Sequence, residues 1–266
     1  MADVADAGAH AEVAARLRSA GSVFAEEEAD LLLAELDGDE LELAIQDRVH
    51  GEPLEHILGW AEFAGLRVAV HPGVFVPRRR TELLLEQALA HLPRHGLLVE
   101  LCCGSAALAT AVAAGRADAS VLASDLDRAA VDCARENLER YGGQVVTGDI
   151  ASGVPEQLWG RVDVVVANAP YVPTRQLGLM PAEARLHEPV LALDGGPDGT
   201  RVQDRVVAAA VELLSPTGVV VVEASRSEAE QTAARMVWRG FIPDVVLDDD
   251  LDATCVVGRR SLPPDE

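Results

Sequence analysis

The chain contains no lysine: all 22 basic residues among its 266 are arginines, against 44 aspartates and glutamates. Without lysine it cannot form a Schiff base with a carbonyl group or pyridoxal phosphate, and it cannot complete the phosphate-binding loop that ends in Lys-Ser/Thr. The formal net charge of −22 also disfavours a broad basic surface for duplex nucleic acid, because such binding depends on neutralising phosphates. We therefore expect no direct nucleic-acid partner.

Aromatic residues make up only 3% of the chain and hydrophobic residues 49%, so the core must be aliphatic. The four cysteines, Cys102, Cys103, Cys133 and Cys255, have the spacing of neither a zinc site nor a disulfide framework, so we expect reduced thiols and no metal. The longest apolar runs, such as Val219–Val222, have the length of a strand. We expect no membrane-spanning segment and no export signal, and hence a cytoplasmic protein.

The first fifty residues are predicted to form helices. Glu26–Leu36 carries leucines behind an acidic first turn, which suits the positive end of a helix dipole. Asp37-Gly38-Asp39 interrupts this pattern, and Glu40–His50 resumes it. We expect these residues to form a small module that is too small for a hydrophobic core of its own.

A connector rich in glycine and proline follows the module. Within it, the apolar segments Ile57–Phe63 and Leu66–Val70 flank Ala64-Gly65, so we expect a short β-hairpin. The resulting division is an N-terminal helical module at residues 1–52, a connector with the hairpin at residues 53–80 and a larger domain at residues 81–266.

From about residue 81 onward, predicted helices alternate with short apolar strands. The helices are expected at residues 82–92, 106–114, 128–141, 202–214 and 227–239, and the strands at residues 97–102, 120–124, 144–147, 162–167 and 218–223. This alternation predicts a doubly wound α/β sheet, with the valine run at 162–167 as a central buried strand. Two strands near 241–247 and 253–258 are expected to add an antiparallel hairpin. Residues 168–200 are irregular, and ordered loops of such length are frequently binding loops or lids.

Acidic residues follow the predicted strands at one edge of the sheet. Glu100 lies on a strand that leads through Gly104 and Ser105 into a helix, where glycine allows a ligand close to the backbone and the helix N-terminus offers free N–H groups. Asp125 ends the next strand, where a carboxylate can accept hydrogen bonds from both ribose hydroxyls, unless it only caps the following helix. Asp149, after the third strand, suits an adenine amino group. These elements predict an adenosine-bearing ligand and leave NAD and S-adenosylmethionine open.

The segment Asn168-Ala169-Pro170-Tyr171 follows the central valine run. The chain has two tyrosines and only two asparagines, and one of each lies in these four residues. A carboxamide oxygen and a neighbouring backbone carbonyl can together accept both N–H bonds of a planar NH₂ group, and a tyrosine ring can stack on the flat group that carries it. Such nitrogens are poor nucleophiles because their lone pairs are delocalised. The segment therefore indicates a transferase acting on an amide or exocyclic amine, with a proline-rich turn capped by Asn168 as the alternative.

Several motifs resemble a known family. Asn168–Tyr171 is similar to the N-P-P-Y signature of S-adenosylmethionine-dependent amino methyltransferases, with Ala169 in place of the first proline. Residues 51–84 (GEPLEHILGWAEFAGLRVAVHPGVFVPRRRTELL) and 187–199 (HEPVLALDGGPDG) resemble landmarks of the HemK/PrmC-type protein-(glutamine-N5) methyltransferases, and ELCCGSAA at 100–107 lies at the position of their cofactor loop. The resemblance spans residues 25–258. It implies a class I, Rossmann-like methyltransferase domain with a small N-terminal helical domain that helps to bind a protein substrate.

The resemblance also implies the cofactor S-adenosyl-L-methionine and, as methyl acceptor, the glutamine of a Gly-Gly-Gln loop in a peptide-release factor. The residues expected to bind the cofactor are Glu100, Cys102, Gly104, Ser105, Asp125, Leu126, Asp149, Ile150 and Asn168. The residues expected to act in catalysis are Asn168, Ala169, Pro170 and Tyr171, and those expected to contact the substrate are Asn168, Tyr171 and Arg78. In this hypothesis the Asn168 side chain and the Ala169 carbonyl hold the acceptor amide, and methyl transfer is an in-line displacement without a dedicated base.

Besides Ala169, the chain departs from the family pattern at Ala106 and at residues 77–82, where the family's P-R-P-E/D-T-E landmark has become P-R-R-R-T-E. Ala106 replaces the second glycine of the cofactor loop, and Arg78-Arg79-Arg80 forms one of the few concentrated positive spots in an acidic chain. Three other functions stay open: an adenine-N6 methyltransferase that flips a base out of nucleic acid, an N-methyltransferase acting on a small molecule, and a catalytically silent cofactor-binding protein. The net charge opposes the first of these, and the resemblance implies contact with nucleic acid only through a ribosome-associated partner. Nothing in the sequence predicts an oligomeric state.

Overall fold

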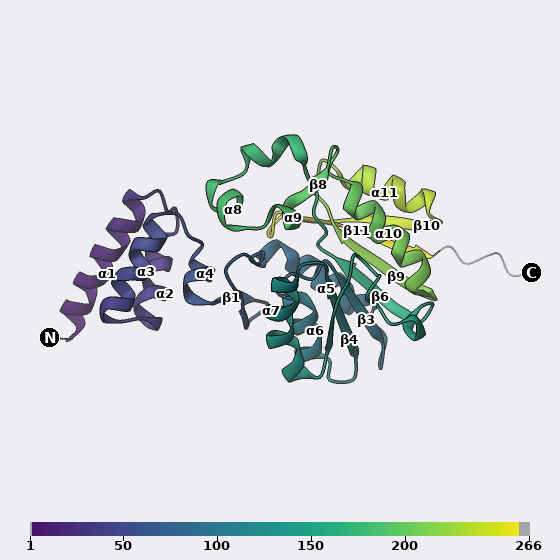
Figure 1. Ribbon diagram of the computed structural model, residues 1–266, viewed down its shortest axis with the longest axis horizontal. Coiled ribbons are helices and arrows are strands. Elements are labelled where there is room, and N and C mark those ends of the chain that lie inside the picture. The colour runs from purple at the N-terminus through teal and green to yellow at the C-terminus, as the bar shows by residue number, and fades with distance from the viewer. Residues whose placement is uncertain (1, 261–266) are drawn as a thin grey trace, which may run out of the picture.

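The computed structural model describes residues 2–260, with side chains from residue 8 onward. A helical part on the N-terminal side adjoins a larger α/β part (Figure 1). The helical part consists of α1 (Ala2–Ser19), α2 (Ala25–Glu35), α3 (Gly38–Val49) and α4 (Leu54–Leu58). Three glutamates, Glu26–Glu28, lie in the first turn of α2, where carboxylates stabilise the positive end of the helix dipole.

The N-terminal helices enclose a hydrophobic cluster of their own. Its buried members are Val13, Ala14, Leu17, Ala25, Ala29, Leu32, Ala44, Ile45 and Leu54. The expectation that this module is too small for a core is therefore wrong, because alanines at the contacts let the helices pack closely around a few large side chains. Since Leu54 of α4 belongs to the cluster, this core extends past residue 52. The division at residues 1–52, 53–80 and 81–266 stays a prediction.

The connector contains a hairpin where the sequence predicts one. Its strands are β1 (Trp60–Phe63) and β2 (Leu66–Ala69). Ala64 and Gly65 form the two-residue turn, and both have a positive φ, which matches the twist of paired strands. The expected first strand begins too early, since Ile57 lies in α4 and Gly59 ends that helix in the left-handed conformation.

A seven-stranded sheet forms the centre of the larger part (Figure 1). In spatial order its strands are β10 (Phe241–Asp248), β11 (Ala253–Arg260), β9 (Leu214–Glu223), β6 (Val162–Ala167), β3 (Leu97–Leu101), β4 (Ser120–Asp125) and β5 (Gln144–Thr147). From β9 to β5 neighbouring strands run parallel, whereas β11 pairs antiparallel with both β9 and β10. The predicted doubly wound sheet with its terminal antiparallel hairpin is confirmed.

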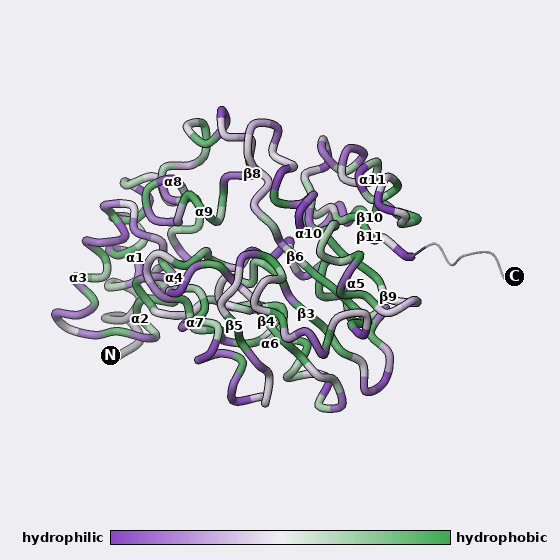
Figure 2. The backbone as a smooth tube through the Cα atoms, turned by 45° about the vertical axis from the view of Figure 1, so that its right-hand side comes forward, coloured by the Kyte–Doolittle hydropathy of each residue, from purple (hydrophilic) through white to green (hydrophobic). Residues whose placement is uncertain are grey.

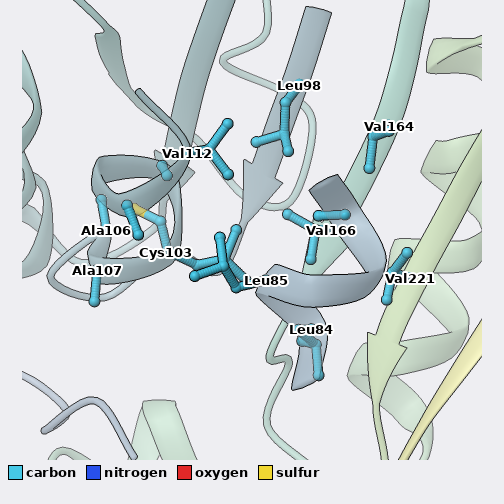
Figure 3. Packing of buried hydrophobic residues seen from close by; sticks show 14 of the residues in the cluster. Leu84, Leu85, Leu98, Cys103, Ala106, Ala107, Val112, Val164, Val166 and Val221 are labelled. Atoms are coloured by element: carbon cyan, nitrogen blue, oxygen red, sulfur yellow. The ribbon is translucent and has the colours of Figure 1, made fainter. Parts of the chain in front are cut away.

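Helices cover both faces of this sheet. They are α5 (Glu82–His91), α6 (Ala107–Gly115) and α7 (Arg128–Leu138) on one face, and α10 (Arg201–Leu213) and α11 (Ala229–Trp238) on the other. Because successive strand residues point to opposite faces, Leu98 and Val164 pack with α5 and α6, whereas Val99 and Val165 pack with α10. Figure 3 shows the first cluster, to which the strands contribute Leu98, Val164 and Val166 and the helices contribute Leu84, Leu85 and Val112. Figure 2 shows hydrophobic residues along the central strands, in agreement with the expected aliphatic core.

Short elements lie in the stretch 168–200, which the sequence predicts as irregular. They are β7 (Val172–Pro173), the 3₁₀ helix Thr174–Leu179, α8 (Ala182–His187), α9 (Val190–Leu193) and β8 (Asp194–Gly196). β7 and β8 pair in parallel, so residues 174–193 form a closed loop, called here the 174–193 loop. Glu183 of α8 pairs with Arg48 of α3 at 3.1 Å, and Arg48 also pairs with Glu28 of α2 at 2.8 Å. These ion pairs tie the loop to the N-terminal helices.

Further 3₁₀ turns lie at Arg79–Thr81, Glu139–Tyr141 and Glu156–Leu158. Among residues 2–260, none of the helices is both long enough and apolar enough to cross a membrane.

Candidate active site

A cavity of about 440 Å³ opens at the carboxyl ends of β3, β4, β5 and β6. Its volume is in the range of ligand sites, and its place is the edge where doubly wound sheets bind their ligands. The residues predicted from the sequence all line it, namely Arg78, Glu100, Cys102, Gly104, Ser105, Asp125, Leu126, Asp149, Ile150, Asn168, Ala169, Pro170 and Tyr171. The fold thus brings the whole predicted set to the walls of one cavity, and the role of each residue stays a prediction.

The turn between β3 and α6 has an unusual backbone. Cys102 and Ala106 both have φ of 55°, a left-handed conformation that is unfavourable for residues with a side chain, and Gly104 adopts it at 54° without that cost. Residues with a strained backbone cluster at ligand sites, where contacts with the surrounding structure keep them in an unfavourable conformation. Ala106 therefore keeps a glycine-like conformation at the position where the family pattern has glycine.

Glu100 lies in β3 with its carboxyl group buried. Its Oε2 accepts a hydrogen bond of 2.8 Å from the N–H of Ala109, in the first turn of α6. Burial, assisted by the nearby Asp125 carboxylate, raises the pKa of Glu100 to about 8. At neutral pH the group is therefore mainly protonated, so it can accept this backbone bond and also donate a hydrogen bond to a ligand.

Asp125 joins the end of β4 to the turn after β3. Its Oδ2 accepts a hydrogen bond from the Gly104 N–H, and its Oδ1 accepts one from the Asp127 N–H, both at 2.9 Å. The helix cap is instead Asp127, whose Oδ1 accepts the Ala129 N–H at 2.9 Å. Asp125 therefore does not cap the helix. Burial raises the pKa of Asp125, and Asp125 lines the cavity, as its predicted contact with a ribose requires.

Asp149 and Ile150 follow β5, the strand beside β4, at the same carboxyl edge of the sheet. Asp149 Oδ2 accepts a hydrogen bond of 2.7 Å from Arg205 of α10, a cavity residue that the sequence does not indicate. Ile150 has φ of 57°, which a β-branched residue adopts only when its surroundings hold it there. One such contact is the hydrogen bond of 3.1 Å that the Ser124 hydroxyl donates to the Ile150 carbonyl.

Asn168 follows the last residue of β6, with Ala169 and Pro170 buried behind it. Its Nδ2 donates a hydrogen bond of 3.3 Å to the Thr81 hydroxyl at the start of α5. Because the amide nitrogen is engaged there, the Asn168 Oδ1 is the atom left to accept a hydrogen bond from a ligand in the cavity.

Tyr171 is held by two charged side chains from distant segments. Its hydroxyl accepts a hydrogen bond of 2.8 Å from Arg80 and donates one of 3.4 Å to Glu223, at the end of β9. Burial raises the pKa of Tyr171 to about 12, so its hydroxyl stays protonated. The sequence interpretation missed Glu223 and Thr81. For Glu223 a signal was available, because it is an acid directly after the valine run 219–222, much as Glu100 is an acid near the end of the apolar strand β3.

The arginine triplet is mostly neutralised by buried carboxylates. Arg78 donates a hydrogen bond of 2.5 Å to Glu188 Oε1, which also accepts the Val76 N–H, and Arg80 pairs with Glu223 at 3.2 Å. The interpretation of the triplet as a concentrated positive spot is therefore wrong, because two of its three charges are compensated. Glu188 Oε2 is buried, lies in the cavity wall and has no hydrogen-bond partner among the described residues.

These groups fit S-adenosylmethionine. The unpartnered Glu188 Oε2 is an acceptor suited to an ammonium group, and the Asp125 carboxylate is suited to a ribose. Leu126 and Ile150 give the cavity apolar lining for a base. The cysteines are free, and burial raises the pKa of Cys102 and Cys103, so neither is a ready nucleophile. Among residues 2–260, no group of three or more His, Cys, Asp or Glu side chains could hold a metal ion.

Comparison with known proteins places these features among methyltransferases. The model of the methyltransferase small domain matches residues 65–196. A release factor glutamine methyltransferase of Geobacter sulfurreducens is 35% identical over 215 residues, which cover 80% of this chain and 75% of that protein. A 4-amino-L-phenylalanine/4-methylamino-L-phenylalanine methyltransferase of Streptomyces pristinaespiralis is 38% identical over 188 residues, 67% of this chain and 63% of that protein.

A solved structure shares the fold. The T. thermophilus 16S rRNA N2 G1207 methyltransferase, in complex with AdoMet and guanosine, aligns with a TM-score of 0.55 and 19% identity over 76% of this chain and 50% of that chain.

Proposed function

The chain belongs to the release factor glutamine methyltransferase family and is an S-adenosylmethionine-dependent methyltransferase, and we propose that it methylates the side-chain amide nitrogen of a glutamine in a protein substrate. The observation that carries this proposal is the orientation of Asn168. Its Nδ2 is engaged by Thr81, so its Oδ1 is available to a substrate NH₂ group in the cavity.

When bound, S-adenosylmethionine supplies an electrophilic methyl group. The chain's own residues bind and orient the cofactor and the acceptor group, and they exclude water from the cavity. The Asn168 Oδ1 and the Ala169 carbonyl accept the two N–H bonds of the acceptor amide, which fixes its plane and localises its lone pair for attack. The Tyr171 ring lies beside this plane, held in place through its hydroxyl. No residue is needed as a base, because the proton leaves readily once the nitrogen has gained a methyl group.

The proposed protein substrate is a release factor that presents its Gly-Gly-Gln loop to the cavity. The name of the Geobacter sulfurreducens relative supports this choice. Two parts of the chain are candidates for holding such a substrate. The 174–193 loop contributes residues to the cavity wall, and the N-terminal helices are joined to this loop by the ion pair between Arg48 and Glu183. Met180 and Leu191 of this loop line the cavity and supply apolar contacts.

A second candidate is N-methylation of an aromatic amine on a small molecule. The relative from Streptomyces pristinaespiralis favours it, since that protein is named for 4-amino-L-phenylalanine. An aniline nitrogen is also planar and partly delocalised, so the Asn168 acceptor pair would serve it in the same way.

The test is methyl transfer from labelled S-adenosylmethionine to a purified release factor, with the modified residue located by mass spectrometry. We expect one methyl group on the glutamine of the Gly-Gly-Gln loop and none on a release factor in which this glutamine is replaced by alanine. Transfer to 4-amino-L-phenylalanine with no transfer to the release factor would replace the first candidate by the second.

A further inference from the structure

Glu223 lies at the centre of a buried polar network behind the cavity. Its side chain is 3% exposed and comes from the last residue of β9, next to β6 in the sheet. Oε2 accepts a hydrogen bond of 2.7 Å from the Thr81 hydroxyl. Oε1 accepts hydrogen bonds from Arg80 at 3.2 Å and from Tyr171 at 3.4 Å. One carboxylate therefore contacts residues from two segments that are distant in sequence from it and from each other, residues 80–81 and Tyr171.

The direction of each hydrogen bond follows from the chemistry of this carboxylate. An ionised carboxylate only accepts, so the Thr81 hydroxyl must donate its single proton to Glu223. The Thr81 oxygen then has only lone pairs left and can only accept. The atom of Asn168 that faces it must therefore be the Nδ2 donor, at 3.3 Å. The charge on Glu223 thus determines which end of the Asn168 amide is turned away from Thr81.

The same carboxylate also fixes Tyr171. Arg80 compensates the buried charge and donates to the Tyr171 hydroxyl, and that hydroxyl has its proton left to donate to Glu223. A tyrosine ring bound at its hydroxyl by a donor and an acceptor has little freedom to tilt. Glu223 therefore contacts Tyr171 directly and Asn168 through one hydroxyl group.

We propose that Glu223 is a positioning residue for methyl transfer, acting through Thr81 to present the Asn168 Oδ1 rather than its NH₂ group to the acceptor nitrogen. The inference rests on the proposed function, since only a substrate NH₂ group needs an acceptor at this point. Glu223 itself does not touch the reacting atoms. Its neutral counterpart glutamine can donate to Thr81, which frees the Thr81 proton for the Asn168 Oδ1 and turns the amide over.

The first experiment reads the orientation of Asn168 without any substrate. The chain has two asparagines, Asn137 and Asn168, so a protein labelled with ¹⁵N-asparagine gives two side-chain NH₂ signals, and Asn168→Ala identifies which is which. In the wild type we expect one Asn168 Nδ2 proton to exchange slowly, because it is bound to Thr81. Glu223→Gln and Thr81→Val should each shift this signal and speed its exchange about 10-fold or more.

Two matched variants serve as controls. Thr81→Ser keeps the hydroxyl group and should leave the Asn168 signal in place. Glu28, on α2, is another buried glutamate paired with an arginine, Arg48 of α3, and neither residue lines the cavity. Glu28→Gln should therefore leave both asparagine signals unchanged.

The second experiment measures methyl transfer. We expect Glu223→Gln and Thr81→Val to lower kcat about 100-fold, with the Kd of S-adenosylmethionine changed by less than about threefold, since misorienting one group in the transition state costs about this factor. Thr81→Val leaves the pair of Glu223 with Arg80 intact, so its effect cannot come from an uncompensated charge. In the Asn168→Ala background, Thr81→Val should cost less than about threefold further, because the residue through which it acts is gone.

The two experiments separate failure of this inference from failure of the proposed function. An unchanged Asn168 signal in both Glu223→Gln and Thr81→Val overturns the positioning role, whatever the substrate. Additive losses of kcat in the Asn168→Ala background overturn it as well. If the signal moves as expected while the wild type methylates no glutamine, the orientation of Asn168 stands and the assigned substrate falls.

Discussion

The Asp125 carboxylate accepts a hydrogen bond of 2.9 Å from the backbone N–H of Gly104, across 21 positions of the chain. This contact fastens the turn after β3 to the end of β4. Both segments line the cavity and are expected to bind the cofactor.

We predict that Asp125→Ala weakens binding of S-adenosylmethionine by about 10- to 100-fold, because hydrogen bonds to a charged group contribute roughly 1.5–3 kcal/mol. Isothermal titration calorimetry measures this change. Asp127→Ala is the matched control. It removes the cap of α7 and should lower the free energy of unfolding by about 1 kcal/mol, with a much smaller effect on cofactor affinity. A larger loss of affinity in Asp127→Ala than in Asp125→Ala would reverse the two assignments.

The raised pKa of Glu100 predicts that the free energy of unfolding depends on pH. Its pKa is raised to about 8 in the folded chain from an ordinary value near 4.5, so the folded state binds its proton more tightly than the unfolded state does. The stability that this proton contributes is present below the ordinary pKa and is lost as pH rises toward 8. Glu100→Gln cannot ionise and keeps an acceptor for the Ala109 N–H.

We therefore expect the free energy of unfolding to decline less between about pH 5 and pH 8 in Glu100→Gln than in the wild type, by a few kcal/mol across that window. Urea unfolding at a series of pH values measures it. The exposed Glu86→Gln should follow the wild-type curve. Parallel curves for Glu100→Gln and the wild type would mean that Glu100 is ionised in the folded chain.

The ion pair between Arg48 and Glu183 predicts how firmly the 174–193 loop is held. Because the chain has no lysine, trypsin can cut this loop only after Arg175 and Arg185. We expect Glu183→Gln to speed cleavage there about two- to fivefold, since a partly exposed pair contributes up to about 1 kcal/mol. Glu42→Gln, which breaks the exposed pair with Arg16, should leave cleavage of the loop unchanged. Equal rates in all three proteins would show that the pair does not hold the loop.

The sequence predicts the sheet well because its signals are local. The run Val162–Ala167 is a strand with the expected bounds, and Leu97–Leu101 differs from its prediction by one residue. Apolar runs and their flanking turns carry this information, and the carboxyl-edge rule then brings Glu100, Asp125 and Asn168 to one cavity.

Features that depend on contacts between distant segments were not predictable in this way. β7 has two residues and is a strand only because it pairs with β8. Thr81 and Glu223 are 142 positions apart, and neither residue indicates by its neighbours that the other will bind it. The same holds for Arg78 and Arg80, whose carboxylate partners lie more than 100 positions away, so a charged triplet looked exposed in the sequence.

The role of Asn168 as the acceptor that orients the substrate amide is tested most directly by one comparison. Wild type and Asn168→Ala are assayed for the rate of methyl transfer to the release-factor glutamine and, by calorimetry, for the Kd of S-adenosylmethionine. The expected result is a rate lowered about 100- to 1000-fold, as for loss of a transition-state hydrogen bond, with a Kd changed by less than about threefold. Equal losses in rate and in cofactor affinity would contradict the account, because Asn168 would then serve the cofactor and not the acceptor nitrogen.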